Sequence, residues 1–271
     1  MGYHHLFGPV LSRRLGTSLG VDLMPQKTCA YDCIYCECGR TLNLTCERRE
    51  YVPADQVIAE LDDFLATAPD LDYVTFAGSG EPTLHTGIER IIAFIKDNYP
   101  HYQVAVLTGS MLLPDPEVRA ALMRADLVVP SLDAVSKEVF EEINRPCPGI
   151  TAERVLAGIT AFAREFTGQI WLEVFIVPGL NDTPEELRLL KDAVAAINPD
   201  RVQINTLDRP GTEIWVRPAN PGKLEQIASM LGGEVIDAAS PGRASSRDAI
   251  DTGEGLVEPV REGKGTFYRA A

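Results

Sequence analysis

The sequence lacks any apolar run of membrane-spanning length, since no stretch approaches the roughly 18 continuous apolar residues that a transmembrane helix needs. Its first residues, Met1 to Leu6, also lack the charged end and apolar centre of a signal peptide. We therefore expect a cytoplasmic protein with no membrane partner. Because cytosolic thiols are kept reduced, its six cysteines are not expected to pair as disulfides.

Basic residues are scarce. The chain has 25 Lys and Arg against 39 Asp and Glu, a net charge of −14, and much of the acidic excess falls in residues 51–150. Nucleic-acid-binding proteins usually present a basic face to phosphate, whereas the basic groups here are small, such as Arg13-Arg14 and Arg48-Arg49. We interpret the acidic excess as solvated outer faces of helices, and it argues against an RNA substrate.

Strand-like and helix-like segments alternate along most of the chain. Its 271 residues, 45% hydrophobic, can bury one large core of the α/β barrel type. Runs rich in β-branched and aromatic residues predict strands at 19–23, 73–77, 103–108, 127–132, 170–177 and 201–206. Apolar residues at helical spacing predict helices at 53–67, 115–124, 136–144 and 151–166, with another starting near Thr183, which has a capping-box spacing to Glu186.

This βα repeat predicts a parallel sheet with helices on its outside. Six strands fall short of the eight that close a barrel, so we expect an α/β fold, an open partial (β/α)6 TIM-like barrel. We expect residues 1–235 to form this domain and residues 236–271 a short C-terminal extension. Segments 256–260 and 266–269 of that extension are compatible with a β-hairpin.

Three cysteines lie within eight residues, Cys29, Cys33 and Cys36. A C-x3-C-x2-C run can hold three of the four irons of a 4Fe-4S cluster and leave the fourth iron open for chemistry. Zinc also binds thiolates and would need a fourth protein ligand, which Cys38 or Cys46 could supply. At the level of this motif both metals remain candidates. The spacing of Cys38, Cys46 and Cys147 matches no ligand pattern for a second cluster, so we interpret them as free or buried thiols.

The cysteine loop, with Tyr35 before its last cysteine, resembles the cluster loop of the radical S-adenosylmethionine (radical SAM) superfamily. After the second strand, Gly78-Ser-Gly-Glu-Pro-Thr-Leu84 resembles the superfamily's Gly-Gly-Glu motif, with Ser79 in place of the first glycine. The resemblance implies that a 4Fe-4S cluster chelates S-adenosylmethionine (SAM) at its open iron. It also implies that Ser79, Gly80 and Glu81 bind the methionine part of SAM.

Polar residues at the ends of later strands extend this candidate site, because chemistry in such folds lies at the carboxyl ends of the strands. They are Thr108 and Ser110 after the third strand, Ser131 and Asp133 after the fourth, and Glu173 in the fifth. Related enzymes contact SAM through hydroxyls at these places. We expect all five, together with Tyr35, to contact the cofactor. For Glu173 the alternative is a contact with the substrate.

Several further segments, among them 8–20, 130–133, 144–149 and 201–206, are similar to an uncharacterised branch of the superfamily related to the wyosine-forming tRNA enzymes. The similarity covers roughly residues 7–230. It implies a radical SAM enzyme that forms a 5'-deoxyadenosyl radical, with a flavodoxin or ferredoxin as reductant. In wyosine-type chemistry a lysine would bind pyruvate, and Lys27 is the lysine near the expected site.

The negative charge makes a small molecule or a peptide the expected substrate rather than tRNA. The alternatives are wyosine-like tRNA base modification with the same cofactors or, from a different class, a non-catalytic iron-sulfur electron carrier or a zinc-binding protein. If either non-catalytic alternative holds, Gly78–Pro82 is an ordinary turn.

Overall fold

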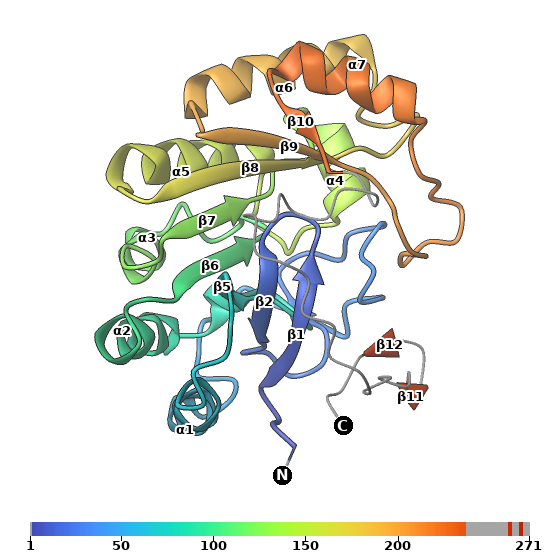
Figure 1. The fold of residues 1–271 in the computed structure, drawn as a ribbon. Coiled ribbons are helices and arrows are strands. Elements are labelled where there is room, and N and C mark those ends of the chain that lie inside the picture. Colours follow the sequence, from blue (N-terminus) through green and yellow to red (C-terminus); the bar gives the residue numbers. More distant parts are fainter. Residues whose placement is uncertain (1, 237–259, 262–265, 268–271) are drawn as a thin grey trace.

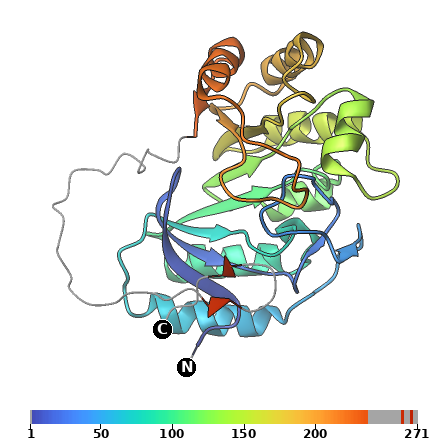
Figure 2. The same cartoon turned by 90° about the vertical axis from the view of Figure 1, so that its right-hand side faces the viewer.

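The structure, a computed structural model, describes residues 2–236, 260–261 and 266–267. In this part of the chain a curved sheet carries helices along its outer side (Figure 1), and a second view shows the β1–β2 ribbon turning away from the plane of the other strands (Figure 2). None of the described helices is both long and apolar enough to cross a bilayer.

The main sheet has eight strands in the order β1-β2-β5-β6-β7-β8-β9-β10. Neighbours from β2 to β10 are parallel, whereas β1 pairs antiparallel with β2. The six predicted strands are β2, β5, β6, β7, β8 and β9, at Gly16–Val21, Tyr73–Phe76, Gln103–Thr108, Leu127–Pro130, Gln169–Phe175 and Arg201–Asn205. The open partial (β/α)6 barrel is confirmed, and β1 (Leu6–Ser12) and β10 (Glu234–Val235) extend its two edges.

The helices bury one stripe each against the sheet. In α2 the buried residues are Ile88, Ile91, Ile92 and Ile95, at steps of three and four. This helix was not among those expected, although its spacing carries the signal. The helices are α1 (Ala54–Leu65), α2 (Ile88–Asn98), α3 (Pro116–Ala121), α4 (Lys137–Asn144), α5 (Ala152–Glu165), α6 (Pro184–Ile197) and α7 (Pro221–Leu231), with a 3-10 turn at Pro82–Leu84.

The turn between β1 and β2 fills one end of the barrel. Leu15 of this turn is buried in a cluster with Ala105, Leu127, Val129 and Trp171, which come from β6, β7 and β8. The turn directly precedes β2, which is parallel to those strands, so it occupies the end at which the strands begin. The opposite end, where the strands finish, is therefore the end at which we expect ligands to bind.

The capping-box spacing at Thr183 forms only in part. The Thr183 hydroxyl accepts a hydrogen bond from the Glu186 backbone N–H at 3.3 Å, as a helix N-cap does. The Glu186 carboxylate does not return to Thr183 in the hydrogen bonds of the described residues. It accepts hydrogen bonds from the backbone N–H groups of Val135 and Ser136, at the start of α4. Glu186 therefore joins the first turns of two helices.

Two further short sheets lie outside the barrel. β3 (Thr28–Cys29) pairs in parallel with β4 (Asn43–Leu44) beside the cysteine loop. β11 (Val260–Arg261) pairs antiparallel with β12 (Thr266–Phe267). The rest of the expected hairpin, at 256–259 and 268–269, lies outside the described residues.

Candidate active site

The cysteine loop begins at β3 and lies across the carboxyl end of the barrel, where backbone hydrogen bonds fix it from several sides. The Thr28 carbonyl accepts from the Glu81 N–H at 3.2 Å, and the Ile34 N–H donates to the Ile143 carbonyl at 2.9 Å. Glu81 follows β5 and Ile143 lies in the last turn of α4, so the loop is held by segments far away in sequence. None of the chain's six cysteines forms a disulfide within the described residues, and all six are partly buried.

Each thiol of the predicted cluster ligands accepts a hydrogen bond from a donor that the other two do not share. Lys27 Nζ lies 2.9 Å from Cys36 Sγ, and Asn144 Nδ2 lies 3.5 Å from Cys33 Sγ. Cys29 Sγ accepts from the backbone N–H two residues further along, at 3.5 Å. Hydrogen bonds to cluster sulfurs orient the ligands and raise the reduction potential of iron-sulfur centres. All three predicted ligands thus have the outer partners that a cluster requires.

Burial opposes ionisation of these thiols unless a cation lies close. It raises the pKa of Cys29 to about 12 and raises the pKa of Cys33, where nearby Cys36 adds to the effect. The pKa of Cys36 is lowered, first by a hydrogen bond with Cys38 and then by the charge of Lys27, which together outweigh burial. A bound metal deprotonates its thiol ligands outright, so a metal cluster would supply the positive charge that two of these buried thiols lack.

Among the described residues, no three His, Cys, Asp or Glu side chains converge closely enough to hold one metal ion. Zinc needs four ligands about 2.0–2.3 Å from one centre, whereas each thiolate of a 4Fe-4S cluster binds a different iron. A zinc ion would therefore need these thiols to move together onto one centre, whereas three thiolates that bind three different irons do not have to converge.

The glycine-rich loop after β5 lies directly against the cysteine loop. A Cβ atom on Gly80 would lie 1.9 Å from the Thr28 carbonyl oxygen, so glycine alone fits this contact. Ser79 donates from both its backbone N–H, at 2.9 Å, and its hydroxyl to the Asp22 carboxylate at the end of β2. Asp22 therefore fixes the predicted SAM-binding loop, and the serine that replaces the motif's first glycine makes this anchor.

Glu81 is buried, and its carboxylate accepts hydrogen bonds from other parts of the protein. It accepts hydrogen bonds from the Thr108 hydroxyl at 2.7 Å, the Gly109 N–H at 2.8 Å and the Thr83 N–H at 3.1 Å. Burial raises the pKa of Glu81, and these hydrogen bonds act against that rise. The side chain of Glu81 joins the ends of β5 and β6, which leaves the backbone of residues 79–81 as the part of the motif that can meet SAM.

Unpartnered buried polar atoms gather at this end of the barrel. In the part of the chain that the structure describes, buried side-chain atoms without a hydrogen-bond partner are Ser110 Oγ, Tyr31 Oη and Asn144 Oδ1. Ser110 follows β6 with a left-handed backbone (φ 70°), and Tyr31 and Asn144 belong to the cysteine loop and the end of α4. Buried polar groups are normally paired, so this concentration fits a site that receives a polar ligand.

Asp133 joins three segments below the cysteine loop. Its carboxylate accepts hydrogen bonds from the Tyr35 hydroxyl at 2.6 Å, Asn144 Nδ2 at 2.8 Å and the Phe175 N–H at 3.0 Å. The Tyr35 ring stacks on the Phe175 ring with centroids 3.8 Å apart. Burial raises the pKa of Asp133 to about 6. Asp133 and Tyr35, both predicted cofactor contacts, therefore bind each other and hold the cysteine loop on β8.

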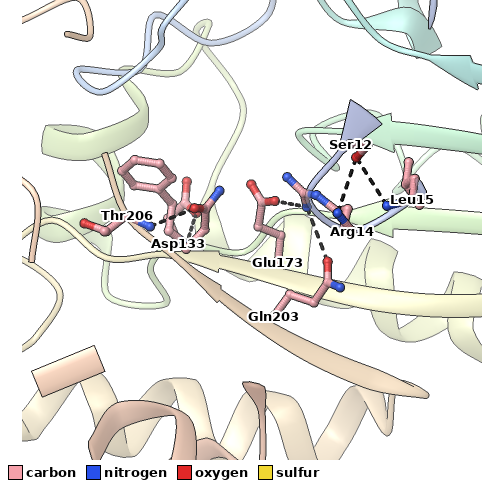
Figure 3. A network of polar contacts seen from close by, with 9 residues as sticks. Ser12, Arg14, Leu15, Asp133, Glu173, Gln203 and Thr206 are labelled. Atoms are coloured by element: carbon pink, nitrogen blue, oxygen red, sulfur yellow. Dashed lines mark hydrogen bonds and ion pairs between the residues drawn. The ribbon is translucent and has the colours of Figure 1, made fainter. Parts of the chain in front are cut away.

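Glu173 forms an ion pair in the barrel interior (Figure 3). The Arg14 guanidinium reaches it from the β1–β2 turn, and the same nitrogen lies 3.4 Å from Gln203 Oε1 on β9. Both charged side chains are largely buried, 13% and 14% exposed. Ser131 lies beside Glu173 in a β-bridge, and its backbone N–H donates a hydrogen bond of 2.9 Å to the Thr108 carbonyl. The predicted residues Thr108, Ser131 and Glu173 are thus neighbours across β6, β7 and β8.

The remaining cysteines do not form a common site. Cys38 donates a hydrogen bond to the Gly78 carbonyl at 3.4 Å, close to the predicted SAM loop. Burial and a hydrogen bond with Cys147 raise the pKa of Cys46 to about 12, so the thiol of Cys46, which follows β4, lies beside that of Cys147, which follows α4. Two thiols in one place and one in another do not supply the ligand set of a second cluster.

Three residues of the site were not among the predicted contacts: Asp22, Asn144 and Arg14. Asp22 falls inside the strand expected at 19–23, whereas in the structure β2 ends at Val21 and Asp22 directly follows it. The contacts of Arg14 with Glu173 and of Asn144 with Cys33 join residues 159 and 111 positions apart. Local sequence patterns do not predict contacts between residues so far apart in the chain.

Comparisons with known proteins agree with this geometry. The model of the radical SAM superfamily matches residues 23–193. A GTPase Obg of Brachyspira hyodysenteriae is 41% identical over 221 residues, which are 82% of this chain and 32% of that protein. A UPF0026 protein of Methanocaldococcus jannaschii is 34% identical over 228 residues, 83% of this chain and 69% of that protein. The chain therefore spans about a third of the first relative's length.

Solved structures share the fold. A radical SAM methyltransferase from Sphaerobacter thermophilus superposes with a TM-score of 0.61 at 17% identity, covering 83% of this chain and 70% of that one. The structure of TYW1 with a lysine-pyruvate adduct superposes with a TM-score of 0.57 at 15% identity, covering 80% and 74%. The chain belongs to the radical SAM superfamily, whose cofactors are a 4Fe-4S cluster and SAM, and within it to the UPF0026 family.

Proposed function

We propose that this chain is a radical SAM enzyme in which Cys29, Cys33 and Cys36 hold the cluster. When bound, the cluster and SAM together supply a 5'-deoxyadenosyl radical, formed by one-electron reductive cleavage, that abstracts hydrogen from a substrate. The observation that carries the proposal is the set of three partly buried thiols, each with its own hydrogen-bond donor, packed against the loop of Ser79 and Gly80.

The protein's own residues orient the cofactors and limit access of water. Asp22 holds the loop at Ser79 so that its backbone groups face the cysteine loop. Asp133 holds the cysteine loop in place by accepting a hydrogen bond from Tyr35. The turn carrying Leu15 closes the far end of the barrel. A dry, shaped interior confines a reactive species to its target.

We propose a small molecule or a peptide as the substrate. The net charge of −14 opposes the approach of a polyanion such as tRNA. Lys27, the candidate for a pyruvate adduct, directs its Nζ to Cys36 at 2.9 Å and is 6% exposed. The lysine is thus engaged with a predicted cluster ligand, which argues against the wyosine-type use of a lysine at this position. A one-electron donor such as flavodoxin or ferredoxin completes the system.

The test is anaerobic reconstitution with iron and sulfide, reduction with dithionite and addition of SAM. We expect 5'-deoxyadenosine from the wild type and from Cys46→Ala, and none from Cys33→Ala. Absence of 5'-deoxyadenosine from the wild type, with a full complement of iron and sulfide and with cell extract supplied as a source of substrates, would overturn the proposal. It would favour the electron-carrier alternative.

A further inference from the structure

Two cysteines that are not predicted cluster ligands lie side by side. Cys46 follows β4 and Cys147 follows α4, so segments far apart in sequence bring them together. A hydrogen bond joins their side chains, and both residues are partly buried free thiols. Because an S–S bond is about 2.05 Å long, two sulfurs in hydrogen-bond contact need to approach by only about 2 Å to form a disulfide.

The backbone holds both cysteines against the start of the cysteine loop. The Thr45 N–H donates to the Cys29 carbonyl at 3.0 Å, and the Cys147 N–H donates to the Ala30 carbonyl at 2.9 Å. β4, which leads to Cys46, also pairs in parallel with β3. The segments that carry the two thiols are therefore both bonded to the stretch that leads into the predicted cluster ligands, and this fixes them close to each other.

A surface hollow lies between these two segments. Its lining includes Leu44 of β4 from one segment and Arg145, Cys147 and Ile150 from the other. Leu44 is itself 42% exposed. A small oxidant in solution can therefore reach Cys147 through this hollow.

The hydrogen bond gives the two thiols different parts. Burial and the bond with Cys147 raise the pKa of Cys46 to about 12, so Cys46 keeps its proton and donates the hydrogen bond to the Cys147 sulfur. A hydrogen bond to a sulfur favours its thiolate form, which is the form that attacks a peroxide. Cys147 is thus placed as the attacking thiol and Cys46 as the resolving thiol.

We propose that Cys46 and Cys147 are a redox-active pair that a hydroperoxide converts to a disulfide. The Cys147 thiolate attacks one oxygen of hydrogen peroxide, breaks the O–O bond and becomes a sulfenic acid, and hydroxide leaves. The Cys46 sulfur then displaces the sulfenic oxygen, which leaves as water with the Cys46 proton. In total the two thiols lose two electrons and two protons, and the peroxide is reduced to two water molecules. The inference does not depend on the proposed SAM chemistry.

The disulfide would join the chain after β4 to the chain after α4, beside the stretch that leads into the cluster ligands. Disulfides that form transiently in reducing compartments are usually catalytic or redox-sensing. In the cluster-loaded protein the predicted ligand sulfurs would be bound to iron, so this pair would take up the oxidant at sulfurs that the cluster does not use.

The test adds equimolar hydrogen peroxide to the cluster-loaded full-length chain under anaerobic conditions. Free thiols are then blocked with N-ethylmaleimide, and the peptides are mapped by mass spectrometry without reduction. We expect two peptides linked through Cys46 and Cys147, which a dithiol reductant separates. Cys38→Ser is the matched control, because it removes a thiol beside the Gly78 carbonyl and should leave the link intact.

Cys46→Ser removes the resolving thiol. The sulfenic acid of Cys147 should then persist, and dimedone should label it about tenfold more than in the wild type. Unlinked, alkylated Cys46 and Cys147 in the wild type after peroxide treatment would overturn the proposal, as would a link from either residue to Cys38. Equal dimedone labelling of Cys147 in the wild type and in Cys46→Ser would also overturn it.

Discussion

Lys27 gives the sharpest prediction about the cluster, because it places a buried positive charge on a predicted ligand. Its Nζ lies 2.9 Å from Cys36 Sγ, and the residue is 6% exposed with a left-handed backbone (φ 50°). Burial is the largest single influence on the pKa of Lys27 and acts to lower it, but the charge and hydrogen bond of Cys36, together with the charges of Cys29 and Cys38, outweigh burial and the pKa is raised. Lys27 is therefore cationic beside the cluster, where it favours an added electron. Lys27→Met removes the charge and keeps a similar length.

The size of the effect follows from the distance. Two unit charges 2.9 Å apart interact by about 6 kcal/mol at an effective dielectric constant of about 20. An added electron is spread over the whole cluster, so about a quarter of this value, about 1.4 kcal/mol, should depend on Lys27. For a one-electron couple that is about 59 mV. The midpoint potential of Lys27→Met should thus be more negative than that of the wild type by about 60 mV.

The assay is a redox titration of the reconstituted protein followed by the electron paramagnetic resonance signal of the reduced cluster. Lys137→Met is the control, since this lysine is 67% exposed on α4 and its loss should leave the potential unchanged. An unchanged or less negative midpoint in Lys27→Met, with a full iron and sulfide content, would refute the reasoning. Loss of the cluster would instead show that Lys27 is needed to retain it.

Three further predictions concern folding and can be measured by urea denaturation of the apoprotein. Gly80→Ala should lower the free energy of unfolding by about 1–3 kcal/mol, because its Cβ would lie 1.9 Å from the Thr28 carbonyl oxygen; an unchanged stability would contradict the close contact. Arg14→Met should cost about 3–5 kcal/mol, because it leaves the buried Glu173 unpaired, and Glu173→Met added to it should restore most of the loss. If the double variant is no more stable than the single one, the pair is not the cause. Burial raises the pKa of Asp133 from 3.8 to about 6, so the folded state binds this proton more tightly and stability should fall by about 3 kcal/mol as the pH rises from about 4 to above 6. Asp133→Asn should remove that part of the slope, and a slope identical to the wild type's would contradict the assignment.

Much of the architecture could be predicted because the signals are local. Each of the six βα strands is an apolar run with turn residues at its end, and parallel order follows from the helices between them. The antiparallel strand β1 was not predicted. Its turn carries Arg14 and Leu15 into the barrel, and that outcome depends on how the ribbon folds back across the strands.

Part of the candidate site could also be predicted from local sequence, and part could not. Motif spacing was enough to single out the cysteines and the loop at Ser79–Glu81. It did not show that Glu81 and Asp133 are occupied by protein hydrogen bonds, because their partners lie on other strands and helices. The contact of Lys27 with Cys36 also required the structure, since a lysine nine residues before a cysteine has no fixed relation to it in a loop.

The most direct test of the central claim is whether SAM binds the open iron of a cluster held by three cysteines. Electron-nuclear double resonance of the reduced protein with SAM labelled with 15N in its amino group and 17O in its carboxylate measures this contact. We predict hyperfine coupling from both labels in the wild type and in Cys46→Ala. A reduced 4Fe-4S cluster that shows coupling to neither label, under conditions in which SAM is bound, would contradict the account.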